Sequence, residues 1–169
     1  MGLELTDEPY DGPVASPLVD ALLVDLNERY AEWADDEGRE DQQAAEDADW
    51  RAEVTPAVVA PPHGAFVVAW LDGDPVGCGA LRRSSYDGEA EVKRMYTVPG
   101  ARRQGVGAAV LAHLEQRARV LGYRALRLET GTAQPEAIAL YEQAGWHRIE
   151  PFGRFRGHPA SVCLAKDLV

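Results

Sequence analysis

The sequence predicts a single α+β domain, which some conventions class as α/β, with a mixed and mostly antiparallel sheet of six to seven strands flanked by helices. Two observations predict this class. Residues 65–98 hold strand-like runs separated by tight turns, which indicates a continuous antiparallel meander. On both sides of it, runs with helical spacing alternate with further strand-like runs. A length of 169 residues suits one domain with a substantial core, so we assign residues 1–169 to it.

The first elements are a short strand at Leu3–Leu5 and a Pro- and Gly-rich stretch at residues 9–17. Ser16 is a good N-cap with Pro17 at the first helical position, so we expect an amphipathic helix from there. Apolar residues continue at helical spacing to the end of that helix: Val19, Leu22, Leu23, Leu26, Tyr30 and Trp33.

An acidic segment follows at residues 31–50. It carries nine acidic residues against one Arg, a net of −8, which leaves only −3 of the total −11 for the rest of the chain. The segment has little apolar period and is interpreted as a second short helix or a flexible flap. It is either a solvated face or an attractor for a cationic substrate. A general basic surface is lacking, so we expect no nucleic-acid partner.

The remaining elements are predicted from the spacing of apolar residues and from the turn-forming residues between them. Strands are predicted at Ala65–Leu71, Pro75–Arg83 and Glu89–Val98, separated by turns at residues 72–74 and 87–88. A glycine-containing loop then opens a helix that Gly122 closes. After it we expect a strand at Arg124–Thr130, a helix at Pro135–Ala144, and strands at Trp146–Phe155 and Ser161–Leu168.

Several functional classes are disfavoured by what the sequence lacks. The beginning of the chain has no basic and apolar leader, and no segment approaches a charge-free membrane span, so we expect a cytoplasmic protein with no membrane partner. Cys78 and Cys163 lie in strand-like runs and are expected to be reduced and buried. The four histidines (His63, His113, His147 and His158) show no ligand spacing, so no metal is expected.

The loop at residues 102–107, Arg-Arg-Gln-Gly-Val-Gly, has the character of an anion cradle. A helix N-terminus offers unpaired backbone N–H groups, glycines let a phosphate approach them, and Arg102 and Arg103 add positive charge. A nucleotide P-loop string is absent. A dinucleotide fingerprint fits only in part: its third glycine falls on Val110, and the preceding strand is too charged for a buried parallel strand, although Glu129 follows where a ribose-binding carboxylate could lie.

A third pattern, Q/R-x-x-G-x-G/A, is matched by Arg102, Gly105 and Gly107. The stretch from Met95 to Leu111, MYTVPGARRQGVGAAVL, resembles the core motif of the GCN5-related N-acetyltransferase (GNAT) family, with Thr97 where an apolar β-branched residue is more usual. Residues 134–146, QPEAIALYEQAGW, resemble the second motif of the family, which usually begins with Asn. The resemblance covers the chain well from Ala65 onward, and the first sixty residues only through an initial strand and helix.

The resemblance implies the acyl-CoA N-acyltransferase fold and direct transfer of an acetyl group from acetyl-CoA to an amine of a small molecule or peptide in a ternary complex. It implies that the strand at residues 95–98 separates from its neighbour at residues 128–130, which leaves backbone N–H donors for the thioester. The cofactor-binding residues it implies are Met95, Tyr96, Thr97, Arg102, Arg103, Gln104, Gly105, Val106, Gly107, Ala108 and Gln134.

Two catalytic residues are implied in the same way. Tyr141 matches a family tyrosine whose hydroxyl protonates the leaving thiolate; the alternative is a packing role for this side chain. Glu91 stands where histone-type members carry a catalytic carboxylate. Glu89 or a water chain is the alternative base, and an ion pair with Arg82 or Arg83 is the alternative role for Glu91.

The acceptor is not determined by the sequence. Its candidate contacts are the first helix, the acidic segment and the loop at residues 152–159, where Arg154 and Arg156 could hold a substrate carboxylate, whereas the acidic segment would suit a polyamine or basic peptide. A longer acyl group is an alternative to acetyl, and a catalytically idle acyl-CoA sensor or interaction module is the alternative to an enzyme. Family members often pair through terminal strands, so a homodimer is a further expectation.

Overall fold

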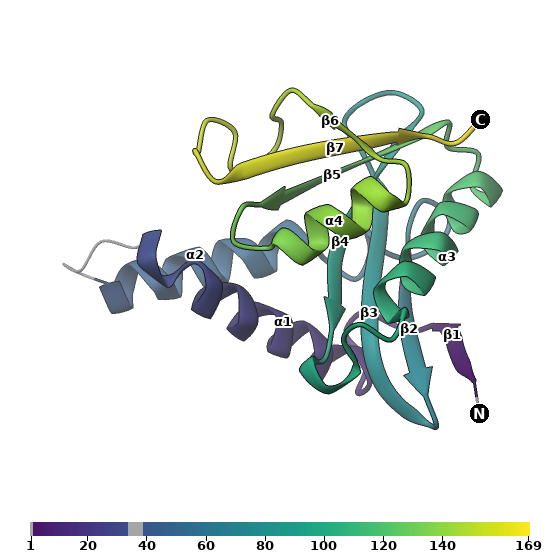
Figure 1. The fold of residues 1–169 in the computed structure, drawn as a ribbon, viewed down its shortest axis with the longest axis horizontal. Helices are drawn as coiled ribbons and strands as arrows, with labels where there is room; N and C mark the ends of the chain where they lie inside the picture. The colour runs from purple at the N-terminus through teal and green to yellow at the C-terminus, as the bar shows by residue number, and fades with distance from the viewer. Residues whose placement is uncertain (1, 34–38) are drawn as a thin grey trace.

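The computed structural model describes residues 2–33 and 39–169 and contains a seven-stranded sheet in the order β1-β2-β3-β4-β5-β7-β6 (Figure 1). Only the β4–β5 pair is parallel. The strands are β1 Leu3–Asp7, β2 Ala65–Leu71, β3 Asp74–Arg83, β4 Glu89–Thr97, β5 Ala125–Gly131, β6 His147–Ile149 and β7 Ser161–Asp167. The helices are α1 Ala15–Arg29, α2 Arg39–Glu53, α3 Val106–Val120 and α4 Pro135–Gln143, with short 3-10 turns at Ala31–Trp33 and Pro99–Ala101. The predicted class and element order are confirmed.

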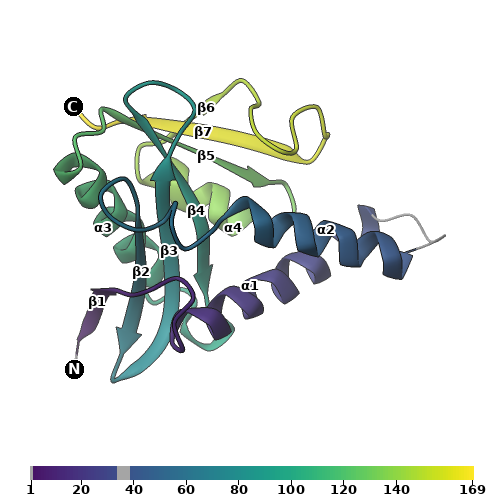
Figure 2. The same cartoon turned by 180° about the vertical axis from the view of Figure 1, so that it is seen from behind.

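Helices cover both faces of the sheet. α3 and α4 lie on the face seen in Figure 1, and α1 and α2 lie together on the face seen in Figure 2, where they project beyond the strands. The larger core packs Val110 and Leu114 of α3 against strand residues such as Leu126. The smaller one packs Leu18 of α1 against Phe66. Alternate strand residues therefore supply two separate apolar layers.

β4 is irregular in two ways that shape the centre of the sheet. It pairs with β5 only from Glu89 opposite Ala125 to Glu91 opposite Arg127, so the two strands separate beyond that point, as expected. Its register against β3 also shifts between Cys78 and Ala80, and Arg94 on the other side has a left-handed φ of 58°. A bulge of this kind bends a strand and redirects its side chains.

The expected start of the first helix is wrong. α1 begins at Ala15, and its N-cap is Val14, which makes no side-chain cap. The turn before the helix already satisfies the Ser16 amide, which donates to the Gly12 carbonyl at 3.0 Å, so Ser16 lies inside the first turn. Pro17 is tolerated there because first-turn amides lack intrahelical acceptors.

Two other expectations need correction. The predicted strand at residues 146–155 contains only β6, because Pro151 and then Gly153 and Gly157, both with positive φ, turn the chain into a long loop before β7. In the acidic segment, α2 is longer than the short helix or flap expected. The acidic residues at positions 35–37 lie outside the described residues. Both cysteines are free and buried, as predicted.

Candidate active site

The glycine loop presents a row of backbone N–H groups at the start of α3. Arg103 and Gly105 have positive φ values of 62° and 82°, which turn the chain sharply into the helix. In the described part of the chain, the amides of residues 103–108 have no protein acceptor; the first helical acceptor is the Gly105 carbonyl, which receives the Ala109 amide at 3.0 Å. The positive end of the α3 dipole adds to these donors, so the loop fits an anionic group.

The two loop arginines have different surroundings. Arg102 donates from Nε to the Thr97 carbonyl at 3.0 Å and from Nη2 to Asp25 Oδ1 at 3.1 Å, which ties the loop to β4 and α1. Arg103 is exposed, and so is Gln104, whose amide returns to the Gly100 carbonyl at 3.1 Å. Arg102 therefore fixes the loop, and Arg103 is the loop arginine that faces solvent.

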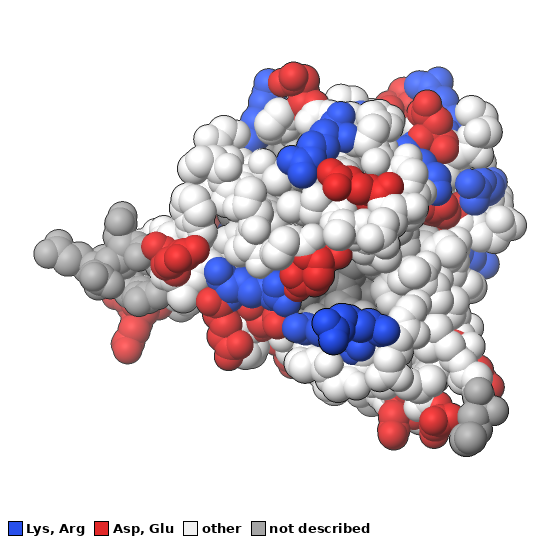
Figure 3. Space-filling view, in the orientation of Figure 1, with Lys and Arg blue, Asp and Glu red and all other residues white. Residues whose placement is uncertain are grey.

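The space in front of the loop is open. A Cβ on Gly105 would meet no atom within 4 Å, whereas a Cβ on Gly107 would lie 3.1 Å from Leu140 of α4. α4 thus packs directly beside the first turn of α3. Figure 3 shows a hollow in this region, bordered below by basic side chains and above by acidic ones, where Figure 1 places the loop before α3 and the start of α4.

The predicted donor-binding residues of β4 lie at the opening between β4 and β5. Thr97 Oγ1 lies beside Gly77 and Gly107, and Met95 packs near Gly79 on the α3 side. Tyr96 lies on the α1 side, under the Arg102 guanidinium. Beyond Glu91 the β5-facing edge of β4 has no strand partner within the described ranges, so its backbone groups are available to a ligand.

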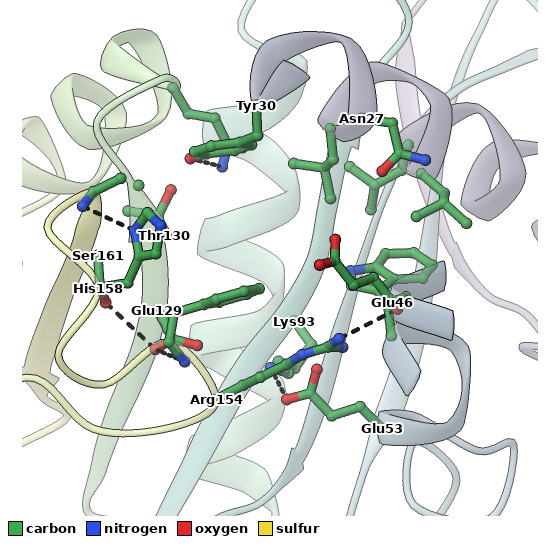
Figure 4. Close-up of a pocket in the computed structure, with 18 of the residues that line it drawn as sticks. Asn27, Tyr30, Glu46, Glu53, Lys93, Glu129, Thr130, Arg154, His158 and Ser161 are labelled. Carbon is green, nitrogen blue, oxygen red and sulfur yellow. Dashed lines mark hydrogen bonds and ion pairs between the residues drawn. The ribbon is translucent and has the colours of Figure 1, made fainter. Parts of the chain in front are cut away.

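A cavity of about 420 Å³ lies behind this opening (Figure 4). Residues of α1 and α2 line one part of it, and residues of β4, β5 and α4 line another part. All three regions expected to contact the acceptor reach it: α1, α2 and the loop before β7. In Figure 4, Glu129, Arg154 and His158 face Glu46 and Asn27 across the cavity. Arg156 does not line it; this residue lies at a separate pocket beside Arg127.

Tyr141 enters the cavity from α4. Its side chain is 5% exposed, with the Trp146 ring centroid at 5.9 Å, and burial raises the pKa of its phenol above the usual value of 10. Burial is the cause of this rise in the pKa. Gln134 lines the same cavity and donates to the Tyr30 hydroxyl at 3.1 Å. The Tyr141 hydroxyl is thus protonated and has no hydrogen-bond partner among the residues that the structure describes.

Glu91 lies outside the cavity lining and in a buried ion-pair cluster. It is 6% exposed and pairs with Arg82 Nη2 at 2.9 Å and with Lys93 Nζ at 3.2 Å. Glu53 also pairs with Lys93, at 2.5 Å, and the nearby cations lower its carboxyl pKa against the effect of burial. Glu89 pairs with Arg127. The geometry therefore matches the alternative role of Glu91, the ion pair with Arg82.

A carboxylate that the sequence did not single out as catalytic, Glu129 on β5, opens into the cavity. Its Oε2 accepts the Phe155 amide at 3.2 Å and the Ser161 hydroxyl at 3.4 Å, while Oε1 receives no hydrogen bond from the described residues. Burial raises the pKa of this carboxyl group. In the sequence, Glu129 drew attention only as a candidate ribose-binding carboxylate, and its place two residues after Arg127 on one face of a strand is too common a pattern to indicate a catalytic site.

Comparison with known proteins assigns the family. Residues 23–146 match the model described as the Acetyltransferase (GNAT) family. The chain belongs to the GNAT family. It is 41% identical over 110 residues to an IAA acetyltransferase of Azospirillum brasilense, a match that covers 65% of this chain and 72% of that protein.

Solved structures of GNAT-type proteins have the same fold. A Klebsiella pneumoniae protein, assigned provisionally as an acyl-CoA N-acyltransferase, aligns over 99% of this chain and 98% of its own, with a TM-score of 0.74 and 28% identity. The PaiA N-acetyltransferase of Thermoplasma acidophilum, solved in complex with coenzyme A, aligns over 99% of both chains with a TM-score of 0.73; at 16% identity this likeness concerns the fold.

This GNAT protein is an acetyl-CoA-dependent N-acetyltransferase, and nothing in the comparisons supports the idle-sensor alternative. Across residues 2–33 and 39–169 no set of three or more His, Cys, Asp or Glu side chains is arranged to hold a metal ion. The same residues include no helix long and apolar enough to cross a membrane.

Proposed function

We propose that the amides of residues 103–108 bind the diphosphate of acetyl-CoA and that its thioester arm enters the opening between β4 and β5. The observation that carries this proposal is the row of unpaired amides at the start of α3, directly beside the strand opening that leads to Tyr141. Exposed Arg103 adds a mobile cation, and Arg102 holds the loop through Asp25. The backbone N–H groups of Met95 and Thr97, which alternate with the β3-facing amides of Tyr96 and Val98, stabilise the oxyanion.

Acetyl-CoA supplies the acetyl group as an activated thioester. The acceptor ammonium loses one proton to a base, the resulting amine adds to the carbonyl carbon, and the C–S bond breaks. The departing sulfur gains a proton from an acid, and the second proton that the nitrogen loses as the amide forms restores that acid. Tyr141 donates its hydroxyl proton to the departing sulfur. Its raised pKa keeps that proton in place at neutral pH, and its burial excludes water that would hydrolyse the thioester.

For the other proton we propose Glu129 in place of Glu91. Glu129 Oε1 is free to accept an ammonium N–H, its Oε2 is held by the loop before β7, and a raised pKa brings a carboxylate closer to the value of an effective base. Glu91 already shares its charge with Arg82 and Lys93, so its proposed role is to position Lys93 at the cavity wall.

Release of the coenzyme A thiol in the presence of amines tests this proposal. Glu129→Gln is the informative variant and Glu91→Gln its matched control, since both remove one half-buried or buried carboxylate from the same side of the sheet. We expect kcat to fall by about 100-fold in Glu129→Gln and to stay within threefold in folded Glu91→Gln. The reverse order would restore Glu91 as the base, and equal turnover of both with the parent enzyme would favour a water chain.

A cytoplasmic location and a homodimer formed through terminal strands stay proposals. Fractionation of the producing cells and light scattering over a range of protein concentrations test them separately. A single mass equal to one chain at all concentrations would contradict the dimer.

A further inference from the structure

The cavity walls carry charged groups that differ in how far the protein neutralises them. Lys93 and Glu53 neutralise one another, and Asp47 accepts the side-chain amides of Asn27 and Gln43 at 3.0 and 2.8 Å. Arg154 crosses the mouth and donates to the Glu46 carbonyl at 3.2 Å, in an exposed position. Deeper in the cavity, two opposite charges lie on the two strands that separate.

The first deep charge is Arg94 on β4, which is 6% exposed and lines the cavity. The bulge at this residue, with φ of 58°, directs both Arg94 and its neighbour Lys93 to the same side of the sheet, although successive strand residues normally alternate. Its guanidinium carbon lies 3.5 Å from the Trp50 ring centroid. The bulge therefore holds the Arg94 cation in the buried wall of the cavity and not at the surface.

The partners of Arg94 leave part of its guanidinium free. Nε donates to the Tyr10 hydroxyl at 3.3 Å and Nη2 donates to the Trp50 carbonyl at 2.5 Å. Among the described residues Arg94 forms no ion pair with a carboxylate, and the hydrogen bonds of its guanidinium come from Nε and Nη2. Burial lowers the pKa of Arg94 and the charge of Glu53 partly offsets this, so the cation has an anion nearby but none in contact. A carboxylate in direct contact is the usual group that a planar guanidinium binds.

The second deep charge is Glu129 on β5, whose Oε1 is free as described above. Arg94 on β4 and Glu129 on β5 line the same cavity from the two strands that separate, and the charge of Lys93 opposes the effect of burial on the Glu129 pKa. A ligand that spans these two groups presents a positive nitrogen to Glu129 on β5 and a negative group to Arg94 on β4.

We propose that the acceptor is a small molecule of the amino-acid class, in which one amine and one carboxylate lie close together. This rests on the function proposed above. The ammonium binds Glu129 Oε1, and the carboxylate binds Arg94 Nη1. The side chain of the acceptor contacts the apolar part of the wall, which Leu22, Leu26 and Trp50 provide. A cavity of about 420 Å³ accommodates one such molecule.

The inference separates this acceptor from the polyamine that the acidic segment alone would suggest. A polyamine would place a second cation near Arg94 and Lys93, inside a poorly hydrated cavity, where like charges repel strongly. Of the acidic residues of α2 that line the cavity, Glu53 is paired with Lys93 and Asp47 is engaged with neutral amides.

Matched pairs of acceptors test the proposal in thiol-release assays with saturating acetyl-CoA: L-phenylalanine against 2-phenylethylamine, and L-leucine against isoamylamine, with spermidine as the polyamine. We expect kcat/KM to be at least tenfold higher for the amino acid in at least one pair. An equal or higher kcat/KM for the decarboxylated amines, or for spermidine, overturns the proposal while leaving the acetyltransferase function intact.

The variant Arg94→Met tests the residue assignment. It should bring the ratio within each pair close to one by raising KM for the amino acid alone, whereas Arg119→Met, which removes a distal arginine that also donates to a carbonyl, should leave the ratio unchanged. An undiminished ratio in folded Arg94→Met overturns the role of Arg94. If Arg94→Met does not fold, the comparison of acceptors with the parent enzyme decides the acceptor class by itself. Binding of acetyl-CoA without turnover of any amine would instead overturn the proposed function.

Discussion

Removing the hydroxyl of Tyr141 separates catalysis from packing, because its ring is buried and its oxygen has no partner among the described residues. Tyr141→Phe keeps the ring against Trp146 and leaves no unsatisfied protein group, so the free energy of unfolding should change by less than about 1 kcal/mol. A general acid contributes about 10²- to 10⁴-fold to a rate.

The structure places the expected loss near the lower end of that range. The phenol pKa lies above its usual value of 10, while a thiol has a pKa of about 8.5, so the proton moves uphill by more than about 1.5 units, or roughly 2 kcal/mol. Burial also disfavours the thiolate, which offsets part of this difference. We expect a fall of about 100-fold in the single-turnover rate at neutral pH.

The assay is thiol release under single-turnover conditions, with affinity for coenzyme A measured separately. Tyr123→Phe is the control, because it removes a hydroxyl that donates to the His63 carbonyl at 2.6 Å. That variant should lose about 1 kcal/mol of stability and keep its rate. A single-turnover rate in Tyr141→Phe within twofold of the parent enzyme would refute the acid role and leave Tyr141 with packing alone.

Three further predictions concern charged and buried groups. Burial raises the Glu129 pKa in the folded protein, so ionisation of Glu129 destabilises the fold as pH rises through that pKa. Glu129→Gln should therefore raise Tm at neutral pH and remove the acidic limb of the kcat/KM profile. An unchanged acidic limb would contradict this prediction. Glu91→Gln should lower the free energy of unfolding by roughly 3 kcal/mol in urea titrations, because it leaves two buried cations to share Glu53, and a loss below about 1 kcal/mol would refute this. Burial raises the Cys78 pKa to about 12 and also raises that of Cys163, so neither thiol should react with a disulfide reagent before unfolding; rapid labelling in native buffer would show that the strands open.

The sequence predicted the central elements because their signals are local. The hairpin from Ala65 to Arg83 rests on strand period and the turn at residues 72–74, and the structure agrees within one residue. The glycine loop and α3 likewise combine a motif with a regular helical spacing. The family motifs pointed to Tyr141 and Gln134, and both residues line the cavity.

The parts that the sequence missed depend on contacts between distant segments. α2 has too few apolar residues for helical spacing to predict it. It is held by tertiary contacts such as Trp50 against Arg94 and Arg51 with Asp20. Arg94 reads as an ordinary strand residue, because the bulge that turns it into the cavity depends on the β3–β4 register. The Glu129 carboxylate is held by the Phe155 amide, which lies in a loop more than twenty residues later in the chain.

Calorimetric titration of coenzyme A into the Gly105→Leu and Gly122→Leu variants tests most directly whether the start of α3 binds the diphosphate. Both glycines have strongly positive φ, 82° and 87°, and neither has an atom within 4 Å of a built Cβ, so the two substitutions cost a similar strain of about 1–2 kcal/mol. They lie at opposite ends of α3. We predict that the Kd for coenzyme A rises at least tenfold in Gly105→Leu alone. Equal Kd values in both variants and in the parent enzyme would contradict the account.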